Sequence, residues 1–191
     1  MKQELKTFLS RRRKNTNQYP AFKPSAVLVL IFEKDGEYHV LFTKRTDRVQ
    51  THKGQVSFPG GACDAEDRTR LYTALREGFE EIGVKTGDID VLGELDDVPT
   101  IGSQYVISPF VGVMPWPYEF EVCVEEVDAI LAVPIEDLIR QACLEIEAVD
   151  WRGKRVRSIS YYYEDEIIWG ATARILNQFL EIWKEVREKS K

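Results

Sequence analysis

The chain has 191 residues, of which 43% are hydrophobic, and it carries a formal net charge of -6 at neutral pH. A chain of this size can bury one sizeable core, and no low-complexity linker divides it, so we expect a single domain. The negative charge disfavours a nucleic-acid partner, and the longest apolar run, residues 26–32, is too short to span a bilayer.

The chain begins with a predicted helical, basic arm over residues 1–24, and we assign residues 25–191 to the domain itself. The arm carries the run Arg11-Arg12-Arg13-Lys14. A solvated arm is the simpler interpretation of this run, and attraction of an anionic ligand is the alternative. No aromatic residue lies between Leu9 and Gln18, which disfavours an RNA-binding patch.

Two β-rich runs follow, at residues 26–32 and 38–43, and the sequence Lys34-Asp35-Gly36-Glu37 between them predicts a hairpin. Three further strands are predicted near residues 89–95, 106–114 and 129–133, and a short helix is predicted to begin at Pro134. A hairpin is predicted over residues 151–163, with its turn at 152–154. A long C-terminal helix closes the chain, and its buried side chains are predicted as Leu176, Phe179, Leu180 and Trp183. This interrupted pattern fits an α/β/α sandwich with a mixed sheet.

Between these strands, the glycine turn Gly60-Gly61 precedes a predicted helix with an acidic side. Because each helical residue turns the chain by roughly a hundred degrees, Glu77, Glu80 and Glu81 fall within about a hundred-degree arc. The apolar stripe of this helix is predicted as Leu71, Leu75, Phe79 and Ile82. Its start is expected at a cap formed by Asp67 or Thr69, and its end at Gly83.

The acidic side has two interpretations. A solvated charged face is the commoner explanation of neighbouring glutamates. However, carboxylates that repel one another near the C-terminal turns of a helix destabilise it, and a bound cation would remove that repulsion. Carboxylate oxygens select Mg²⁺ or Mn²⁺ over zinc, and no His/Cys cluster competes. We therefore predict a metal site formed by Glu77, Glu80 and Glu81.

The spacing of these residues resembles the signature of the Nudix hydrolases. The positions that agree are Gly61, Arg76, Glu77, Glu80, Glu81, Gly83 and Val84. Two features depart from the signature: Asp67 stands in place of the first glutamate, with eight rather than seven residues before Arg76, and Gly78 replaces a bulky residue. The resemblance implies a Nudix-type α/β/α sandwich.

A narrower resemblance points to the coenzyme A diphosphatase subgroup of that family. Residues 41–46 and 54–61 are similar to its extra motif, and the longer spacing after Asp67 is familiar there. Phe42, Thr46 and Gln50 depart from the subgroup pattern, and the last replaces an arginine suited to phosphate. Further landmarks lie at residues 95–97, 109–112, 126–127, 133–134 and 168–173.

Cleavage of a diphosphate requires cations that counter the repulsion between its oxygens and the attacking water. Glu77 and Glu81, one turn apart, are assigned as primary ligands, and Glu80 as a further ligand or water-positioning group. Glu80 is the first candidate for the general base, with Glu125 or Glu126 behind it. Solvated loop charge is the favoured interpretation of Glu125 and Glu126. The family resemblance implies that Arg76 orients Glu77 or a neighbouring carboxylate.

The predicted substrate contacts are less specific. Arg45 and Lys53 are candidates to meet phosphates, although exposed charge is the alternative. Phe58, Gly60 and Gly61 are expected to shape a turn that lets the backbone approach the ligand closely.

Three functions remain open. The first is hydrolysis of coenzyme A or acyl-coenzyme A to 3′,5′-ADP and 4′-phosphopantetheine or its acyl derivative. The second is hydrolysis of another nucleoside diphosphate derivative, such as ADP-ribose or a dinucleotide, and the third is a ligand-binding regulator without activity. Three cysteines without a Cys-x-x-Cys pair suit a reducing cytoplasm. We expect a small-molecule substrate, no membrane, and a possible homodimer.

Overall fold

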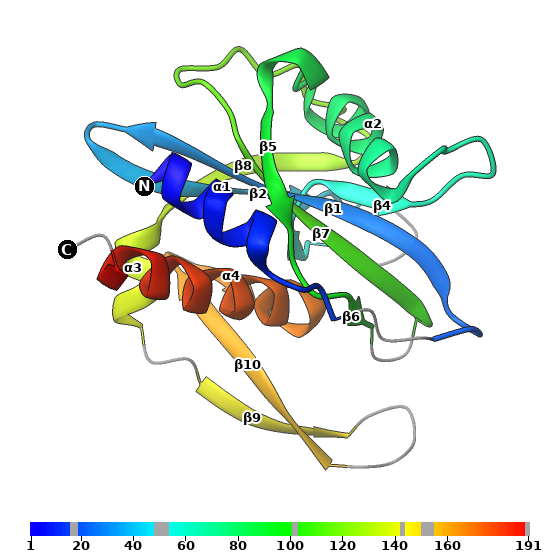
Figure 1. Ribbon diagram of the computed structural model, residues 1–191. Coiled ribbons are helices and arrows are strands. Elements are labelled where there is room, and N and C mark those ends of the chain that lie inside the picture. Colours follow the sequence, from blue (N-terminus) through cyan, green and yellow to red (C-terminus); the bar gives the residue numbers. More distant parts are fainter. Residues whose placement is uncertain (16–18, 48–53, 101–102, 142–143, 150–154, 190–191) are drawn as a thin grey trace.

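A computed structural model describes residues 1–15, 19–47, 54–100, 103–141, 144–149 and 155–189 (Figure 1). The chain forms one α/β domain in which helices lie on both faces of a large mixed sheet. Within the described residues, no helix combines the length and the apolar character that a membrane crossing requires.

The large sheet has eight strands, five of which follow the order β3-β2-β1-β7-β5, while β4 pairs with β1, β6 with β7 and β8 with β2. Strands β1 and β7 run parallel, and the other pairs are antiparallel. The strands are β1 (Lys23–Lys34), β2 (Glu37–Arg45), β3 (Val56–Ser57), β4 (Gly60–Ala62), β5 (Asp90–Glu94), β6 (Val98–Pro99), β7 (Tyr105–Val113) and β8 (Val127–Pro134). The predicted hairpin between β1 and β2 is confirmed.

The central strand β1 explains the longest apolar run of the sequence. Its side chains alternate between the two faces of the sheet, with Val29 and Ile31 in one hydrophobic cluster and Leu28 and Leu30 in the other. Both faces are covered by helices, so residues on both faces are apolar. Helix α2 (Arg70–Ile82) covers one face.

The other face is covered by α1 (Lys2–Arg11) and α4 (Gly170–Lys189), with α3 (Ile135–Arg140) beside them; the short 3₁₀ turn η1 (Thr86–Asp88) follows α2. The buried stripe predicted for the C-terminal helix is confirmed, because Leu176, Phe179, Leu180 and Trp183 are all buried. The short predicted helix begins at Ile135, with Pro134 at its N-cap.

A second sheet has the order β11-β10-β9 and is formed by β9 (Leu144–Val149), β10 (Arg155–Tyr163) and β11 (Glu166–Ile168). The late hairpin was therefore placed too far along the chain, because its first strand ends before Trp151. Trp151 and the predicted turn at 152–154 lie outside the described residues. A second tight turn, at residues 164–165, joins β10 to β11 and was not predicted.

Helix α1 packs into the core, because Leu5 and Leu9 are buried with α4 in one cluster. The basic run after it is not simply solvated. Arg12 pairs with Asp96 at 2.5 Å, and Lys14 lies 2.9 Å from Asp97. The segment from β5 to β6 is acidic, so opposite charges fasten the arm to the sheet edge, and these two residues do not form a free anion-attracting arm.

Helix α2 begins and ends with the predicted signals. The Thr69 hydroxyl accepts a hydrogen bond from the Tyr72 N–H at 3.1 Å, and Gly83 ends the helix in the left-handed region with a φ of 71°. The predicted apolar stripe is wrong at Phe79, which is 52% exposed. The helix instead turns its smallest residues to the sheet, since a Cβ atom on Gly78 would lie only 2.7 Å from Leu28 Cδ1.

Candidate active site

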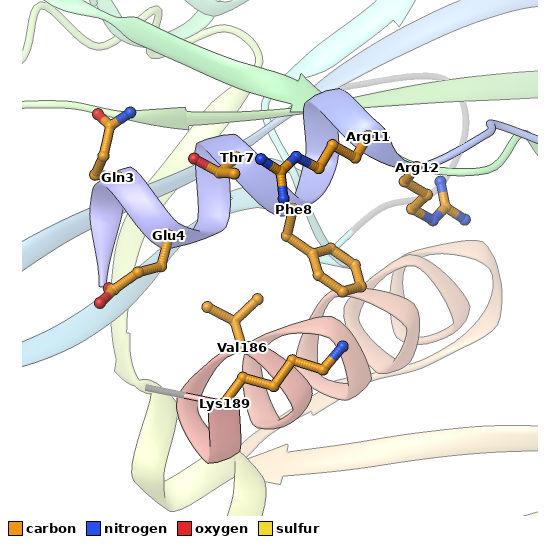
Figure 2. A pocket seen from close by; sticks show the side chains of 8 residues that line it. All are labelled: Gln3, Glu4, Thr7, Phe8, Arg11, Arg12, Val186 and Lys189. Carbon is orange, nitrogen blue, oxygen red and sulfur yellow. The ribbon is translucent and has the colours of Figure 1, made fainter. Parts of the chain in front are cut away.

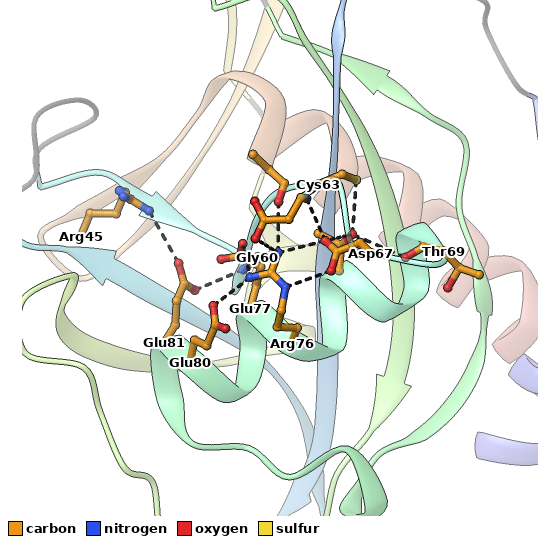
Figure 3. A network of polar contacts seen from close by, with 12 residues as sticks. Arg45, Gly60, Cys63, Asp67, Thr69, Arg76, Glu77, Glu80 and Glu81 are labelled. Atoms are coloured by element: carbon orange, nitrogen blue, oxygen red, sulfur yellow. Dashed lines mark hydrogen bonds and ion pairs between the residues drawn. The ribbon is translucent and has the colours of Figure 1, made fainter.

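The C-terminal half of α2 lies against β4 and the end of β2, and this contact brings the candidate site together (Figure 3). The turn at Gly60 and Gly61 passes directly over the helix. A Cβ atom on Gly61 would lie 2.4 Å from the Glu77 carboxylate, and at Gly60 it would lie 2.3 Å from the Ala26 carbonyl oxygen. At Gly60 the neighbour is backbone and φ is 148°, so only glycine fits there, whereas a Cβ atom at Gly61 would displace the flexible end of the Glu77 side chain.

Glu81 is the most buried carboxylate of the site, with 3% of its surface exposed. Burial raises the pKa of Glu81 to about 8. Two groups lower the pKa of Glu81: the Gly60 N–H, which donates a hydrogen bond to the Glu81 carboxylate at 3.1 Å, and Arg45, which lies 3.6 Å away. The negative charges of Glu77 and Glu126 raise the pKa of Glu81. The protein alone therefore does not stabilise a negative charge at this position.

Glu77 is half-buried and faces the same turn. Burial is the largest cause that raises its pKa, and the charges of Glu80 and Glu126 add to it. Arg76 acts in the opposite direction, at 3.0 Å from the Glu77 carboxylate. Glu77 and Glu81 therefore form a pair of carboxylates, one turn apart, whose charges are each disfavoured by burial and by their neighbours.

Arg76 is the centre of the polar network in Figure 3. Its guanidinium group donates two hydrogen bonds to Asp67, at 3.1 and 3.0 Å, and one to Glu80 at 2.8 Å. It also donates to the Ala62 carbonyl at 3.3 Å and pairs with Glu77. Arg76 thus joins the loop before α2 to the acidic side of the helix. The orienting role that the family resemblance implies for Arg76 stays a prediction.

Arg76 is not the only group that holds the Asp67 side chain in position. Its carboxylate accepts hydrogen bonds from the Thr73 hydroxyl at 2.8 Å and from the Asp64 N–H at 2.9 Å. The bond from Arg76 is the main reason that the pKa of Asp67 lies well below its usual range. Asp67 therefore serves as an anchor for Arg76 in the loop, while Thr69 forms the helix cap.

The structure separates the three predicted metal ligands. Glu80 is the outer member, since its side chain is 55% exposed and bonded to Arg76. Among the described residues, no three acidic, histidine or cysteine side chains converge closely enough to hold a metal ion as they stand. That Glu77, Glu80 and Glu81 bind one metal ion together stays a prediction. In this structure Arg76 forms ion pairs with two of them, Glu77 and Glu80.

The predicted substrate residues have different surroundings. Phe58 is buried and its ring lies 4.7 Å from that of Phe42, so it shapes the turn from within the core and offers no face to a ligand. Arg45 lies beside Glu81, and its Nε is buried without a hydrogen-bond partner among the described residues. Lys53 lies outside the described residues.

Glu126 lies close enough to the site for its charge to raise the pKa of both Glu77 and Glu81. Solvated loop charge was the favoured interpretation of Glu125 and Glu126 in the sequence. The neighbouring strand β8 pairs with β2 and sets Val127 opposite Arg45, which brings the loop to the site. Glu126 comes near the site because β8 pairs with β2 over a long sequence distance. No local sequence signal therefore marks Glu126 as a site residue.

Comparison with known proteins agrees with this geometry. The family model described as "NUDIX domain" matches residues 22–158, which is more than half of the chain. A protein from Photorhabdus laumondii named "Uncharacterized Nudix hydrolase NudL" is 34% identical over 142 residues, covering 74% of this chain and 75% of that protein. One of the same name from Yersinia enterocolitica is 32% identical over 181 residues, covering 93% and 92%.

Among solved structures, the MutT/nudix family protein from Enterococcus faecalis superposes with a TM-score of 0.54 at 14% identity, covering 97% of this chain and 69% of that one. This likeness shows the fold. The chain belongs to the Nudix family. It is a Nudix hydrolase, an enzyme that acts on phosphoanhydride bonds of nucleoside diphosphate derivatives.

Nudix hydrolases generally use divalent ions such as Mg²⁺ or Mn²⁺. The carboxylates of the site are of the chemical type that binds such an ion, although the described side chains do not converge on one point as they stand. Glu77 and Glu81 supply hard oxygen donors one turn apart, and the charge of Glu126 lies near both. The burial that raises the pKa of Glu81 is the unfavourable condition that a bound cation relieves.

Proposed function

We propose that this enzyme hydrolyses the diphosphate linkage of coenzyme A or acyl-coenzyme A to 3′,5′-ADP and 4′-phosphopantetheine or its acyl derivative. The observation that carries the hydrolytic part is the pair formed by half-buried Glu77 and buried Glu81 beneath the glycine turn, with Arg45 beside Glu81. The coenzyme A part is supported by the similarity of residues 41–46 and 54–61 to the subgroup motif.

In this proposal Glu77 and Glu81 are the primary ligands of Mg²⁺ or Mn²⁺, with Glu80 as a further ligand. The bound cation supplies Lewis-acid stabilisation of the phosphate oxygens and acidifies a coordinated water. The Gly60 N–H holds one oxygen of Glu81 in place. Burial raises the pKa of Glu77, and Arg76 acts against this effect by favouring its charged form.

Arg45 is proposed to contact the diphosphate. Its Nη1 faces Glu81 at 3.6 Å, and its buried Nε is a donor without a partner among the described residues. The Arg45 side chain is 25% exposed overall, and its guanidinium charge suits a phosphate oxygen. Lys53 and the backbone of Gly60 and Gly61 are proposed as the remaining contacts with the substrate.

Glu80 remains the first candidate for the general base, since it is exposed and near the acidic pair. Glu126 is the second candidate, supported by its electrostatic effect on Glu77 and Glu81. Glu125 has less support, because its backbone carbonyl accepts a hydrogen bond from the Thr46 hydroxyl and its charge is not a main influence on either carboxylate.

Hydrolysis of ADP-ribose or of a dinucleotide is the second candidate function. It is favoured by the departures from the coenzyme A motif at Phe42, Thr46 and Gln50. Phe42 is fully buried, so its difference from the motif affects packing, whereas Gln50 lies outside the described residues. A ligand-binding regulator without activity is disfavoured by the intact Glu77, Glu80 and Glu81.

Product analysis tests the proposal. Coenzyme A, acetyl-coenzyme A, ADP-ribose, diadenosine polyphosphates and nucleoside triphosphates are incubated with Mg²⁺ or Mn²⁺, and the products are separated by chromatography. We expect 3′,5′-ADP from the first two compounds, with kcat/KM at least about tenfold above that for ADP-ribose. Preferred cleavage of ADP-ribose or of a dinucleotide supports the second candidate, and no cleavage of any compound overturns the hydrolase assignment at this site.

Its cellular setting is also a proposal. We infer a cytoplasmic enzyme that acts without nucleic acid or membrane, since Cys63 and Cys123 are free thiols and the net charge is negative. A homodimer remains possible, and sedimentation measurements decide it.

A further inference from the structure

The loop between β7 and β8, residues 114–126, is bonded to the C-terminal end of α2. Two of its backbone N–H groups donate hydrogen bonds to carbonyl groups of the last helical turn, from Glu121 to Ile82 at 3.2 Å and from Cys123 to Glu81 at 2.9 Å. The last four carbonyl groups of a helix have no partner within the helix, and this loop supplies donors for two of them. The backbone of Glu81 is therefore bonded directly to the loop that carries Glu126.

Glu126 follows Cys123 in a tight turn. The Cys123 carbonyl accepts hydrogen bonds from the N–H groups of Glu126 at 3.0 Å and of Val127 at 2.9 Å. Cys123 thus connects the backbone of Glu81 with that of Glu126 through hydrogen bonds. Because the Glu126 side chain is exposed, its position depends on how the backbone on either side of it is held.

Thr46 holds this backbone from the other side. Its N–H donates a hydrogen bond to the Glu126 carbonyl at 3.0 Å, and its hydroxyl donates one to the Glu125 carbonyl at 2.9 Å. Thr46 is 7% exposed, so water does not readily replace these bonds. It also directly follows Arg45, whose guanidinium group lies 3.6 Å from Glu81.

A β-bulge sets Thr46 against Glu126. The pairing of β2 with β8 shifts in register between Lys44 and Arg45, so that Arg45 lies opposite Val127. In an antiparallel pair, the residue after Arg45 then lies opposite the residue before Val127. Bulges of this kind often lie beside active sites, where they change the direction in which a side chain points.

We propose that Thr46 is a positioning residue, which holds the Glu126 carboxylate beside Glu77 and Glu81 for a part in hydrolysis. This role rests on the proposed function, because only a reaction at the α2 carboxylates gives Glu126 a task there. The two attachments of the loop, at Cys123 and at Thr46, carry the assignment. The charge of Glu126 raises the pKa of both Glu77 and Glu81, which agrees with this position.

Replacement of the Thr46 hydroxyl tests the proposal. Thr46→Val removes the hydroxyl and keeps the N–H and a similar shape. We expect kcat for the preferred substrate to fall about tenfold, with KM within about twofold of the parent value, because Arg45 and the glycine turn still meet the substrate. Thr46→Ser keeps the donor, so its kcat should lie within about twofold of the parent value.

Thr7→Val is the matched control. It makes the same substitution in the groove between α1 and α4, where Figure 2 shows the Thr7 side chain. Helices α1 and α4 cover the face of the sheet opposite to α2, so this variant should leave kcat and KM unchanged.

A double-mutant cycle with Glu126→Gln separates positioning from a general effect on stability. We expect Glu126→Gln alone to lower kcat at least about tenfold, and Thr46→Val to change it by less than about twofold more in that background. Parental kcat in Thr46→Val or in Glu126→Gln overturns the proposal. A loss that persists in the Glu126→Gln background, or that Thr46→Ser shares, overturns it as well. Circular dichroism melts confirm folding, and Thr46→Ala replaces Thr46→Val if the valine variant does not fold.

Mn²⁺ affinity, measured by paramagnetic resonance, provides a readout that does not need turnover. A carboxylate beside the α2 pair strengthens cation binding, so Glu126→Gln and Thr46→Val should each raise the Kd for Mn²⁺ at least about twofold. If the parent chain cleaves none of the diphosphates, the proposed function fails, and this comparison decides the role of Thr46 by itself. A Kd raised in both variants then supports the position assigned to Glu126, and any other result overturns it.

Discussion

At the scale of single residues, the candidate site contains a few carboxylates whose charged forms are disfavoured by burial. Burial raises the pKa of Glu81 to about 8. The nearest arginine lies 3.6 Å away, which is too far for a close hydrogen-bonded pair. Perturbed carboxylates of this kind cluster at functional sites, and we propose that Glu81 serves to bind a divalent cation.

The glycine turn gives a first prediction. Replacement of Gly61 by alanine places a Cβ atom where the Glu77 carboxylate lies, at 2.4 Å, and so displaces that carboxylate. We expect kcat/KM for the preferred substrate to fall about a hundredfold, because a misplacement of about 1 Å has effects of that size. Gly87→Ala is the control, since a Cβ atom there meets nothing within 4 Å. Equal activity of both variants would show that Glu77 has no fixed part in the reaction.

A second prediction concerns the contribution of Asp67 to the stability of the protein at acid pH. Because Arg76 holds the pKa of Asp67 well below the ordinary 3.8, Asp67 contributes stability that is present above that value and is lost as the pH falls through the lower pKa of the folded state. Asp67→Asn should therefore unfold at lower urea concentration than the parent chain at neutral pH. The gap should narrow as the pH falls below about 4. Urea titrations at several pH values measure it, and a gap that stays constant across this range would contradict the assigned ion pair.

At the scale of elements, helix α2 shows how much of the structure could be predicted. Its two ends are encoded locally, by the Thr69 hydroxyl and by the left-handed conformation of Gly83. The side of α2 that faces the sheet, by contrast, is not encoded by local sequence signals. The face that meets the sheet contains Ala74 and Gly78, which carry little hydrophobic signal, so the larger Phe79 was wrongly taken as buried.

The same distinction applies to the site. The acidic residues of α2 follow from spacing along one helix, so they could be predicted. Arg45 and Glu126 reach the site through the pairing of β2 with β8, whose strands are far apart in the sequence. The first strand of the small sheet was missed for a different reason: Leu144–Val149 alternates apolar and acidic residues and pairs with the nearby β10, so a local signal was present and was not used.

The cap of α2 gives a prediction at this scale. Thr69→Ala removes the acceptor of the Tyr72 N–H and should lower the free energy of unfolding by about 1 kcal/mol. Thr69→Ser keeps an acceptor oxygen and should lose much less. Chemical denaturation of the two variants measures the difference. If both lose the same amount, the contribution of Thr69 comes from its methyl group and not from the cap.

At the scale of the whole molecule, the two faces of the sheet are held by different elements. Helix α2 carries the carboxylates on one face, and α1 with α4 closes the core on the other. The division of the chain into an arm of residues 1–24 and a domain of residues 25–191 stays a prediction. The burial of Leu5 and Leu9 indicates that the arm contributes to the stability of the molecule.

This contribution can be measured by a pair of variants in α1. Leu9→Ala removes a buried side chain that contacts the sheet beside Gly93, and it should lower the free energy of unfolding by about 2–5 kcal/mol. Lys6→Ala removes an exposed ion pair with Asp90 and should lower it by less than about 1 kcal/mol. Thermal or urea unfolding gives both values. A larger loss from Lys6→Ala would mean that charge, and not the core, holds the arm.

The central claim is that carboxylates of α2 hold the divalent cation on which turnover depends. The most direct measurement is Mn²⁺ binding by paramagnetic resonance, together with kcat/KM for the preferred substrate, in Glu77→Gln, Glu81→Gln and the control Glu188→Gln on the exposed side of α4. We predict that the first two variants stay folded, bind Mn²⁺ at least about tenfold more weakly and lose activity about a hundredfold or more, while the control is unchanged. Parental metal affinity and turnover in both α2 variants would contradict the account.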